Sequence, residues 1–324
     1  MSSENTKAAK RSLPKRRSKH KRLSMKEIVV DVVYAFTKDG QGGNAAGVLL
    51  DASALTAPQM QDIAAQTNYS ETVFFCPPKE GADHTVRFFA PLKEVPLCGH
   101  GTIAGYAQQF HQGKLTAGAY TMWTQAGVQD ITVSEDGLIG MSQNRPTFGA
   151  TLSPKEIGPL LGISADDFAS DIPIQIVSTG LNKILAPIRS LSAIQSIQPD
   201  LEAIKTLSHQ HNVTGIYTFT LESETGATAH CRNFAPAVGI SEDAATGTSC
   251  AALSCLLYTY DQLAPHALTD LSFEQGYEIG EPSELLASLE VSNGDIVGVR
   301  VMGRATQRGE RRIQLTQETN GEPS

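Results

Sequence analysis

Short runs rich in Val, Ile, Phe and Thr recur along the chain and are separated by turns, which is typical of strands. The strands that we predict span 28–33, 72–76, 120–123, 128–133, 138–141, 216–221, 289–291 and 296–301. Helical periodicity is rarer and shorter, and predicts helices over 57–67 and 201–211. The strands between 120 and 141 follow one another closely, which favours antiparallel pairing. This pattern indicates an α+β fold with a mixed or antiparallel sheet.

An internal repeat is the strongest feature of this pattern. The block Arg87-Phe88-Phe89-Ala90-Pro91 recurs as Arg232-Asn233-Phe234-Ala235-Pro236, 145 positions later. The predicted helix over 57–67 ends at Asn68 before a strand, and the helix over 201–211 ends at Asn212 before another, an offset of 144. A third block, Cys98–Ala104, recurs 148 positions later as Thr246–Ala252. Three ordered blocks at nearly one offset indicate a duplicated lobe. We therefore predict two pseudo-symmetric lobes, at 25–144 and 145–315, with a basic tail at 1–24 and a flexible end at 316–324.

Each copy of the repeat also carries a glycine-rich loop directly before a helix of small residues. The first loop holds Gly99 and Gly101, and the second holds Gly247 and Thr248. A helix N-terminus has unpaired N–H groups and a partial positive charge, so two such termini across a cleft suit a carboxylate or another small anion. The alternative is that these glycines only cap helices and allow tight packing. Neither loop has a nucleotide-binding spacing.

The two copies differ at the positions that could carry chemistry. Glu71 aligns with Gly215, and His100 aligns with Thr248. Asp243 falls in a three-residue insertion of the second copy. A carboxylate at the head of the apolar strand 72–76 would be partly desolvated and suited to proton transfer near neutral pH. The alternative for Glu71 is an ordinary charge at a strand edge in water.

Composition limits the partners. The whole-chain formal charge of −8 includes about +8 from residues 1–24, so the remainder carries about −16, which disfavours nucleic acid except through the tail. The tail has the composition of a nuclear address or a polyanion-binding arm, and Met25 also permits a natural start after it.

No apolar run approaches the roughly 18–20 residues that span a bilayer, and no secretory segment precedes the fold. Five irregularly spaced cysteines indicate a reduced, cytoplasmic protein.

Four motifs, in order, resemble the phenazine-biosynthesis isomerase family, whose relatives include diaminopimelate epimerase and proline racemase. They are Gly43-Asn44-Ala45-Ala46-Gly47-Val48, Ser70-Glu71-Thr72-Val73-Phe74, Val95-Pro96-Leu97-Cys98-Gly99-His100-Gly101-Thr102 and Glu242-Asp243-Ala244-Ala245-Thr246-Gly247-Thr248. The resemblance runs from about residue 28 to 314. It implies two lobes, each with a sheet or open barrel around a central helix, over 101–112 and 248–258, and no cofactor or metal. Thr248 stands where the family usually has Ser, and Ala244 where Pro is common.

The resemblance further implies the site residues and the reaction. Glu71, His100 and Asp243 would be catalytic, and Ser70, Gly99, Gly101, Gly247 and Thr248 would bind substrate. The expected function is a cofactor-independent isomerase that moves a proton within a small acidic metabolite, as a homodimer. An epimerase would need two facing cysteines, and Cys98 faces Thr246, which cannot form a thiolate.

Three other interpretations are weaker. The chain could be a metabolite-binding or interaction module without activity, which deuterium exchange into a cyclic dienyl amino acid would distinguish from an enzyme. Cys98 could be a reactive thiol at a helix N-terminus. Asp83 with His84, and His209 with His211, could bind a metal, but no carboxylate stands at a ligand-like spacing from the histidine pair.

Overall fold

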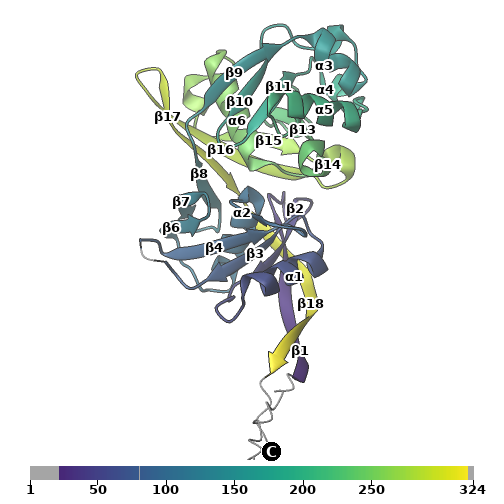
Figure 1. Ribbon diagram of the computed structural model, residues 1–324. Coiled ribbons are helices and arrows are strands. Elements are labelled where there is room, and N and C mark those ends of the chain that lie inside the picture. The colour runs from purple at the N-terminus through teal and green to yellow at the C-terminus, as the bar shows by residue number, and fades with distance from the viewer. Residues whose placement is uncertain (1–21, 80, 320–324) are drawn as a thin grey trace, which may run out of the picture.

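The chain folds into two lobes, seen one above the other in Figure 1. The computed structural model describes residues 22–79 and 81–319. The lower lobe holds the N-terminal half and the last strand, and the upper lobe holds most of the C-terminal half. Strands dominate both lobes and the sheet is mixed, as the sequence predicts.

The first lobe is a mixed sheet with two long helices. Its elements are β1 (Arg22–Ala35), β2 (Asn44–Leu49), α1 (Ala57–Thr67), β3 (Thr72–Cys76), β4 (His84–Phe89), β5 (Glu94–Val95), α2 (Gly99–His111), β6 (Gly118–Thr124), β7 (Gly127–Val133) and β8 (Ile139–Gln143). Strands β1 and β2 form an antiparallel pair, and β2 lies parallel to β3. Strand β3 pairs antiparallel with β4, and β4 lies parallel to β6. Strands β6, β7 and β8 form the predicted antiparallel set.

The second lobe repeats this order. Its elements are β9 (Thr147–Leu152), α3 (Pro154–Leu161), β10 (Ile174–Ser178), β11 (Asn182–Pro187), α4 (Leu191–Gln195), α5 (Leu201–His211), β12 (Ile216–Thr220), β13 (Ala229–Ala235), β14 (Ile240–Asp243), α6 (Gly247–Thr259), β15 (Leu271–Gln275), β16 (Ser283–Ser292) and β17 (Asp295–Gly303), before β18 (Ala305–Thr319). Strands β10 and β11 form an antiparallel pair, and β11 lies parallel to β12. Strand β12 is antiparallel to β13, and β13 is parallel to β15. Strands β15, β16 and β17 are antiparallel. The duplication is therefore present strand by strand.

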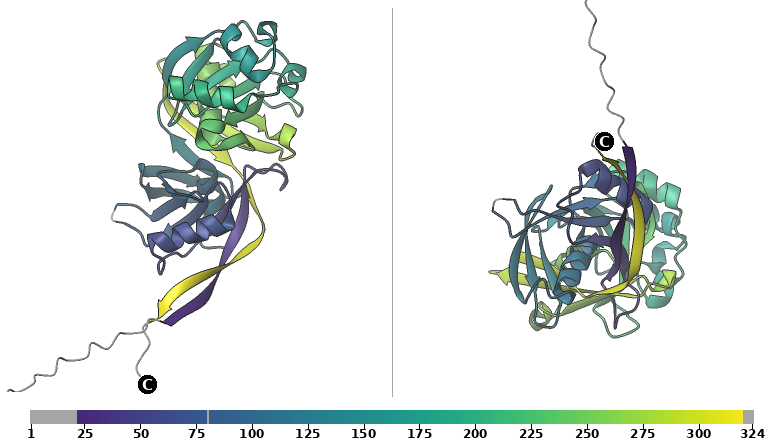
Figure 2. Two further views of the ribbon diagram at one scale, coloured as in Figure 1. Left: turned by 45° about the vertical axis from the view of Figure 1, so that its right-hand side comes forward. Right: turned by 90° about the horizontal axis from the view of Figure 1, so that it is seen from below.

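The sheet of each lobe is completed by a strand that follows directly from the last strand of the other lobe. Strand β9 follows β8 of the first lobe and pairs with β10, whereas β18 follows β17 of the second lobe and pairs with β1. Strands β8 and β17 pair with each other and join the two sheets. Figure 2 shows β18 running beside β1 along the whole first lobe. This pairing corrects the predicted end of the second lobe, because 305–315 belongs to the sheet of the first.

The predicted ends of the fold also differ from the structure. Strand β1 begins at Arg22, within the expected tail, and β18 reaches Thr319, within the expected flexible end. These two ends pair with each other, Arg22 opposite Thr319. The remainder of both predicted segments, 1–21 and 320–324, lies outside the described residues.

A buried helix occupies the centre of each lobe. Helices α2 and α6 begin at Gly99 and Gly247, close to the predicted bounds, and most of their side chains are buried on every side. A helix that is apolar all round requires a surrounding core. Both helices belong to one large apolar cluster that runs through the two lobes. The glycine-rich loops are therefore the N-terminal entrances of two buried helices.

The repeated block R-x-F-A-P has a structural cause. Arg87 donates two hydrogen bonds of 2.7 Å to Glu94, and Arg232 donates two to Glu242, at 2.8 and 2.9 Å. Each pair is bidentate, the strongest geometry for Arg with a carboxylate. Each Arg ties the strand before the glycine-rich loop to the segment that leads into the central helix.

A backbone constraint explains why the second lobe has no counterpart of Glu71. A Cβ at Gly215 would lie 1.9 Å from the carbonyl oxygen of Phe234, so no side chain fits. We predict that Gly215→Ala lowers the free energy of unfolding by about 3 kcal/mol or more, the range of severe strain. Gly180→Ala is the matched control, since a Cβ there meets nothing within 4 Å. Urea unfolding of both variants checks this, and equal stabilities would contradict it.

Candidate active site

Glu71 and His100 lie together where the first lobe faces the second. The Oε2 atom of Glu71 is 3.4 Å from Nε2 of His100, and their side chains are 18% and 11% exposed. Glu71 precedes β3, and its backbone carbonyl accepts a hydrogen bond from the Gly47 N–H. Asn68, in the left-handed conformation, ends α1 and turns the chain toward this position. Glu71 is thus mostly withdrawn from water, unlike an ordinary strand-edge charge.

Two further side chains contact His100. The hydroxyl of Ser70 is 3.4 Å from Nε2, and the sulfur of Cys98 is 3.5 Å from Nδ1. Cys98 is the N-cap of α2, and its sulfur accepts a hydrogen bond from the Gly101 N–H. Burial, and then the charge of Glu71, raise the pKa of the Cys98 thiol well above its ordinary value. Cys98 therefore stays a neutral thiol that orients the histidine.

Asp243 reaches the same place from the second lobe. Its Oδ1 accepts a 2.7 Å hydrogen bond from the amide of Asn44, which belongs to β2 of the first lobe. Its Oδ2 accepts a 2.5 Å hydrogen bond from the hydroxyl of Thr246, the N-cap of α6. Asn44 also donates to the carbonyl of Ala245. The three predicted catalytic side chains therefore come from both lobes to one region.

Burial and the neighbouring charges alter the acidity of Asp243. Desolvation by burial is the largest effect and raises the pKa of this carboxyl, and the charge of Glu71 raises it further. The charge of His100, the hydrogen bond from Thr246 and the charge of Lys183 oppose this increase without cancelling it. Glu71 and His100 both act on the pKa of Asp243, so the three groups lie close enough to influence one another electrostatically.

The N-termini of the two central helices complete the region. At α2, the Gly101 N–H bonds to Cys98 and the Thr102 N–H bonds to the Cys98 carbonyl. Within the described chain, this leaves the N–H groups of Gly99 and His100 without a protein acceptor. Gly247 and Thr248 begin α6, where the side chain of the N-cap Thr246 makes no capping hydrogen bond, and no acceptor for their N–H groups is found among the described residues. Such free N–H groups suit an anionic ligand.

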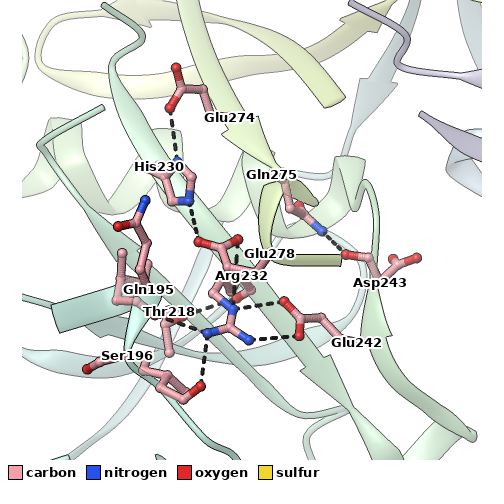
Figure 3. Close-up of polar contacts among 12 residues, drawn as sticks. Gln195, Ser196, Thr218, His230, Arg232, Glu242, Asp243, Glu274, Gln275 and Glu278 are labelled. Atoms are coloured by element: carbon pink, nitrogen blue, oxygen red, sulfur yellow. Dashed lines mark hydrogen bonds and ion pairs between the residues drawn. The ribbon is translucent and has the colours of Figure 1, made fainter. Parts of the chain in front are cut away.

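A buried ionic network supports Asp243 from behind, as Figure 3 shows. His230 is fully buried, with Nδ1 3.0 Å from Glu274 and Nε2 2.8 Å from Glu278. Arg232 lies between Glu278 and Glu242, the residue before Asp243. Gln275, next to Glu274, donates to the Asp243 carbonyl at 2.7 Å. The network anchors the backbone that carries the Asp243 carboxyl.

Sequence reasoning did not find several of these groups. Asn44 lies inside a motif that the sequence singles out, but nothing in the pattern assigns it to Asp243. His230, Glu274 and Glu278 are isolated polar residues in apolar strands or turns. The pairing of β13 with β15 brings His230 to Glu274, and the turn after β15 brings Glu278 to the other side of the His230 ring. The signal that could have indicated these residues is a charged side chain inside a predicted apolar strand, since such side chains are seldom buried without a partner.

The proposed metal-binding pairs have other partners. Asp83 accepts hydrogen bonds from Thr121, and His84 contacts the Tyr106 hydroxyl at 3.1 Å. His211 is 3.7 Å from Glu156. Glu71, Cys98 and His100 could offer three ligand atoms within 4.8 Å of one another, but through a thiol whose pKa is raised. The absence of a metal stays a prediction.

Known proteins match both the sequence and the fold. Residues 33–311 match the PhzC-PhzF family, described as phenazine biosynthesis-like protein. The chain belongs to this family. An uncharacterized isomerase of Clostridium acetobutylicum is 35% identical over 84% of this chain and 93% of its own length. The crystal structure of the PhzF-family protein of Bacillus anthracis covers 89% of this chain and 99% of its own, at 29% identity and a TM-score of 0.80.

Two of the relatives, from Pseudomonas aeruginosa and Pseudomonas chlororaphis, share one named reaction. The trans-2,3-dihydro-3-hydroxyanthranilate isomerase of Pseudomonas aeruginosa is 28% identical over 88% of this chain and 98% of its own length. The isomerase names of the relatives support isomerase activity for this PhzF-family chain and confirm the resemblance seen in the motifs. From residue 22 to 319, Glu80 aside, no helix has the length and apolar character needed to cross a membrane.

The buried histidine predicts a pH dependence of stability. Burial lowers the pKa of His230, but its hydrogen bonds to Glu278 and Glu274 and their charges together raise it. A raised pKa stabilises the fold fully below the unfolded value of about 6.5, and the contribution is lost as pH rises through the folded value. The difference in melting temperature between wild type and His230→Gln should therefore be larger at about pH 6 than at about pH 9.

The control for this measurement is His209→Gln, since His209 is exposed on α5. That variant should melt within about a degree of wild type at both pH values. A difference for His230→Gln that stays constant, or grows with pH, would contradict a charged His230.

Proposed function

We propose that this PhzF-family chain is a cofactor-independent isomerase that moves a proton within a small acidic metabolite. Glu71 acts as the general acid and base. The observation that carries the proposal is the convergence of Glu71 and His100 of one lobe with Asp243 of the other, all linked electrostatically. A purely binding module would have no need of this combination.

The first step removes a proton from carbon. The substrate anion lies against free N–H groups at the start of α2 and α6, near Gly99 and Gly101 and near Gly247 and Thr248. The carboxylate of Glu71 takes the proton, and the C–H electron pair enters the conjugated system of the substrate. The helix N-termini stabilise the negative charge that develops.

The second step returns a proton. The carboxylic acid of Glu71 donates to a different carbon of the conjugated system, and the double bonds shift accordingly. His100 and Ser70 hold Glu71 and the polar groups of the substrate in place, and Asp243 hydrogen-bonds the substrate from the second lobe. The carboxylate of Glu71 is regenerated, so no cofactor is consumed or required.

A two-thiol epimerase mechanism has no support. The two positions where such enzymes would need cysteines are the N-caps of the central helices, Cys98 and Thr246. Thr246 donates its hydroxyl to Asp243 and accepts from Asn233. Because only one of these two positions is a cysteine, inversion by a pair of thiols is disfavoured, and we favour transfer on one face by Glu71.

The substrate class follows from the named relative. We propose a small cyclic carboxylate with conjugated double bonds, related to trans-2,3-dihydro-3-hydroxyanthranilate. A homodimer, predicted from the family, is part of this proposal. Sedimentation at micromolar concentration distinguishes it from a monomer.

The role of Glu71 is tested by Glu71→Gln. General acid–base catalysis is worth about 10²–10⁴-fold, so turnover of trans-2,3-dihydro-3-hydroxyanthranilate should fall by at least about 10²-fold. The melting temperature and ligand affinity should stay close to those of wild type, since Gln keeps the shape of the side chain. Glu135→Gln, at an exposed turn, is the control. A folded Glu71→Gln enzyme with the wild-type rate would refute the assignment.

The two glycines of the first loop provide a second test. A Cβ at Gly99 meets only Met141, at 3.8 Å, whereas a Cβ at Gly101 lies 2.8 Å from Val73. We predict that Gly99→Ala melts like wild type but raises KM about tenfold or more, because the methyl group enters the space for the substrate. Gly101→Ala should lower the melting temperature instead. Unchanged KM in Gly99→Ala would exclude substrate contact at this loop.

A further inference from the structure

The second lobe contains a buried lysine that the mechanism above does not use. Lys183, in β11, is 4% exposed. No carboxylate of the described residues lies within 4.0 Å of its ammonium group, and no described hydrogen bond involves it. A largely buried lysine whose charge has no partner among the described residues is costly, so its retention calls for an explanation outside the ligand-free protein.

The duplication identifies what stands at the corresponding place in the first lobe. The Gly47 N–H bonds to the Glu71 carbonyl, and the Ile184 N–H bonds in the same way to the Gly215 carbonyl. Lys183, just before Ile184, therefore corresponds to Ala46, just before Gly47. One lobe combines a carboxylate with a small residue, and the other combines a glycine with a cation.

Strand pairing shows where the side chain of Lys183 lies. It is opposite Val177 of β10 and two positions before Leu185, so all three side chains share one face of the hairpin. Val177 and Leu185 belong to the apolar cluster that surrounds α6. The turn before β11 is held at the start of α6, since Thr179 donates to the Thr248 carbonyl at 3.1 Å. Lys183 therefore lies beneath the N-terminal turn of α6.

Electrostatics agree with this location. Desolvation lowers the pKa of Lys183 to about 8, and the charge of Asp243 acts against that decrease. The ammonium group is thus still mostly charged at neutral pH, and Asp243 is near enough to affect it. A cation and a helix N-terminus in one place both favour a bound anion.

We propose that Lys183 binds the carboxylate group of the substrate and, together with the N-terminus of α6, selects acidic over neutral substrates. The inference rests on the proposed function for the identity of the site. It assigns the two lobes complementary tasks. The first lobe moves the proton. The second lobe holds the carboxylate of the substrate and thereby positions the reacting carbon.

A matched pair of ligands tests the charge preference directly. Anthranilate carries a carboxylate, and anthranilamide replaces it by a neutral amide of similar shape. Calorimetric titration of wild type should show tighter binding of anthranilate. In Lys183→Met the ratio of the two affinities should fall about tenfold or more, while Lys183→Arg keeps part of it. Lys205→Met, on the exposed face of α5, should leave the ratio unchanged.

The stability of the same variants provides an independent readout. Removing an unpaired buried cation should leave the melting temperature of ligand-free Lys183→Met equal to that of wild type or higher. An unfolded or strongly destabilised Lys183→Met would show a structural role and overturn the proposal. So would wild type without preference for anthranilate, whether from equal binding of both ligands or from binding of neither.

The outcome is separable from the proposed isomerase activity. Glu71→Gln should keep the preference for anthranilate, because it leaves Lys183 in place. If wild type prefers anthranilate through Lys183 but never turns over a conjugated carboxylate, the isomerase proposal fails and the anion site stands. If wild type turns over a conjugated carboxylate but Lys183→Met leaves the affinity ratio unchanged, the isomerase proposal stands and the anion site fails.

Discussion

The hydrogen bond from Asn44 to Asp243 joins the two halves of the site, and the chemistry depends on it. Asn44 belongs to the sheet of one lobe, and Asp243 precedes the central helix of the other. Neither lobe alone contains the full set of groups. Asn44 brings the carboxylate of Asp243 into the field of Glu71 and His100, where burial and the neighbouring negative charge raise its pKa. The relative placement of the lobes is therefore part of the active site.

The two lobes share their framework, and the residues proposed for function lie where the two copies differ. Both lobes hold their glycine-rich loop with a bidentate Arg–Glu pair and begin a buried helix there. At Gly215 the Phe234 backbone leaves no room for a side chain, so Glu71 has no acidic counterpart at this position of the second lobe. The second lobe adds the buried network around His230 behind Asp243. In the proposed mechanism, the first lobe therefore carries the proton and the second lobe holds the substrate.

Much of this arrangement could be predicted from local sequence. The helices over 57–67 and 201–211 have the predicted bounds, because left-handed Asn68 and Asn212 end them. The repeat located both central helices, because the Arg–Glu pairs that hold their loops leave a short sequence block. The exchange of β9 and β18 between lobes could not be predicted, since the pairing of Arg22 with Thr319 has no local pattern. Lys183 escaped notice for a different reason. Only the folded structure reveals that the charge of a lysine in a strand has no partner among residues 22–79 and 81–319.

The central claim is that a single carboxyl, on one lobe, both removes and returns the proton. The most direct test is the reaction of trans-2,3-dihydro-3-hydroxyanthranilate with the wild-type chain in heavy water, with the product examined by NMR. One carboxyl predicts deuterium on one face of the receiving carbon only, with part of the original proton retained. Complete exchange with delivery to the opposite face would require a second base on the other lobe and would contradict the account.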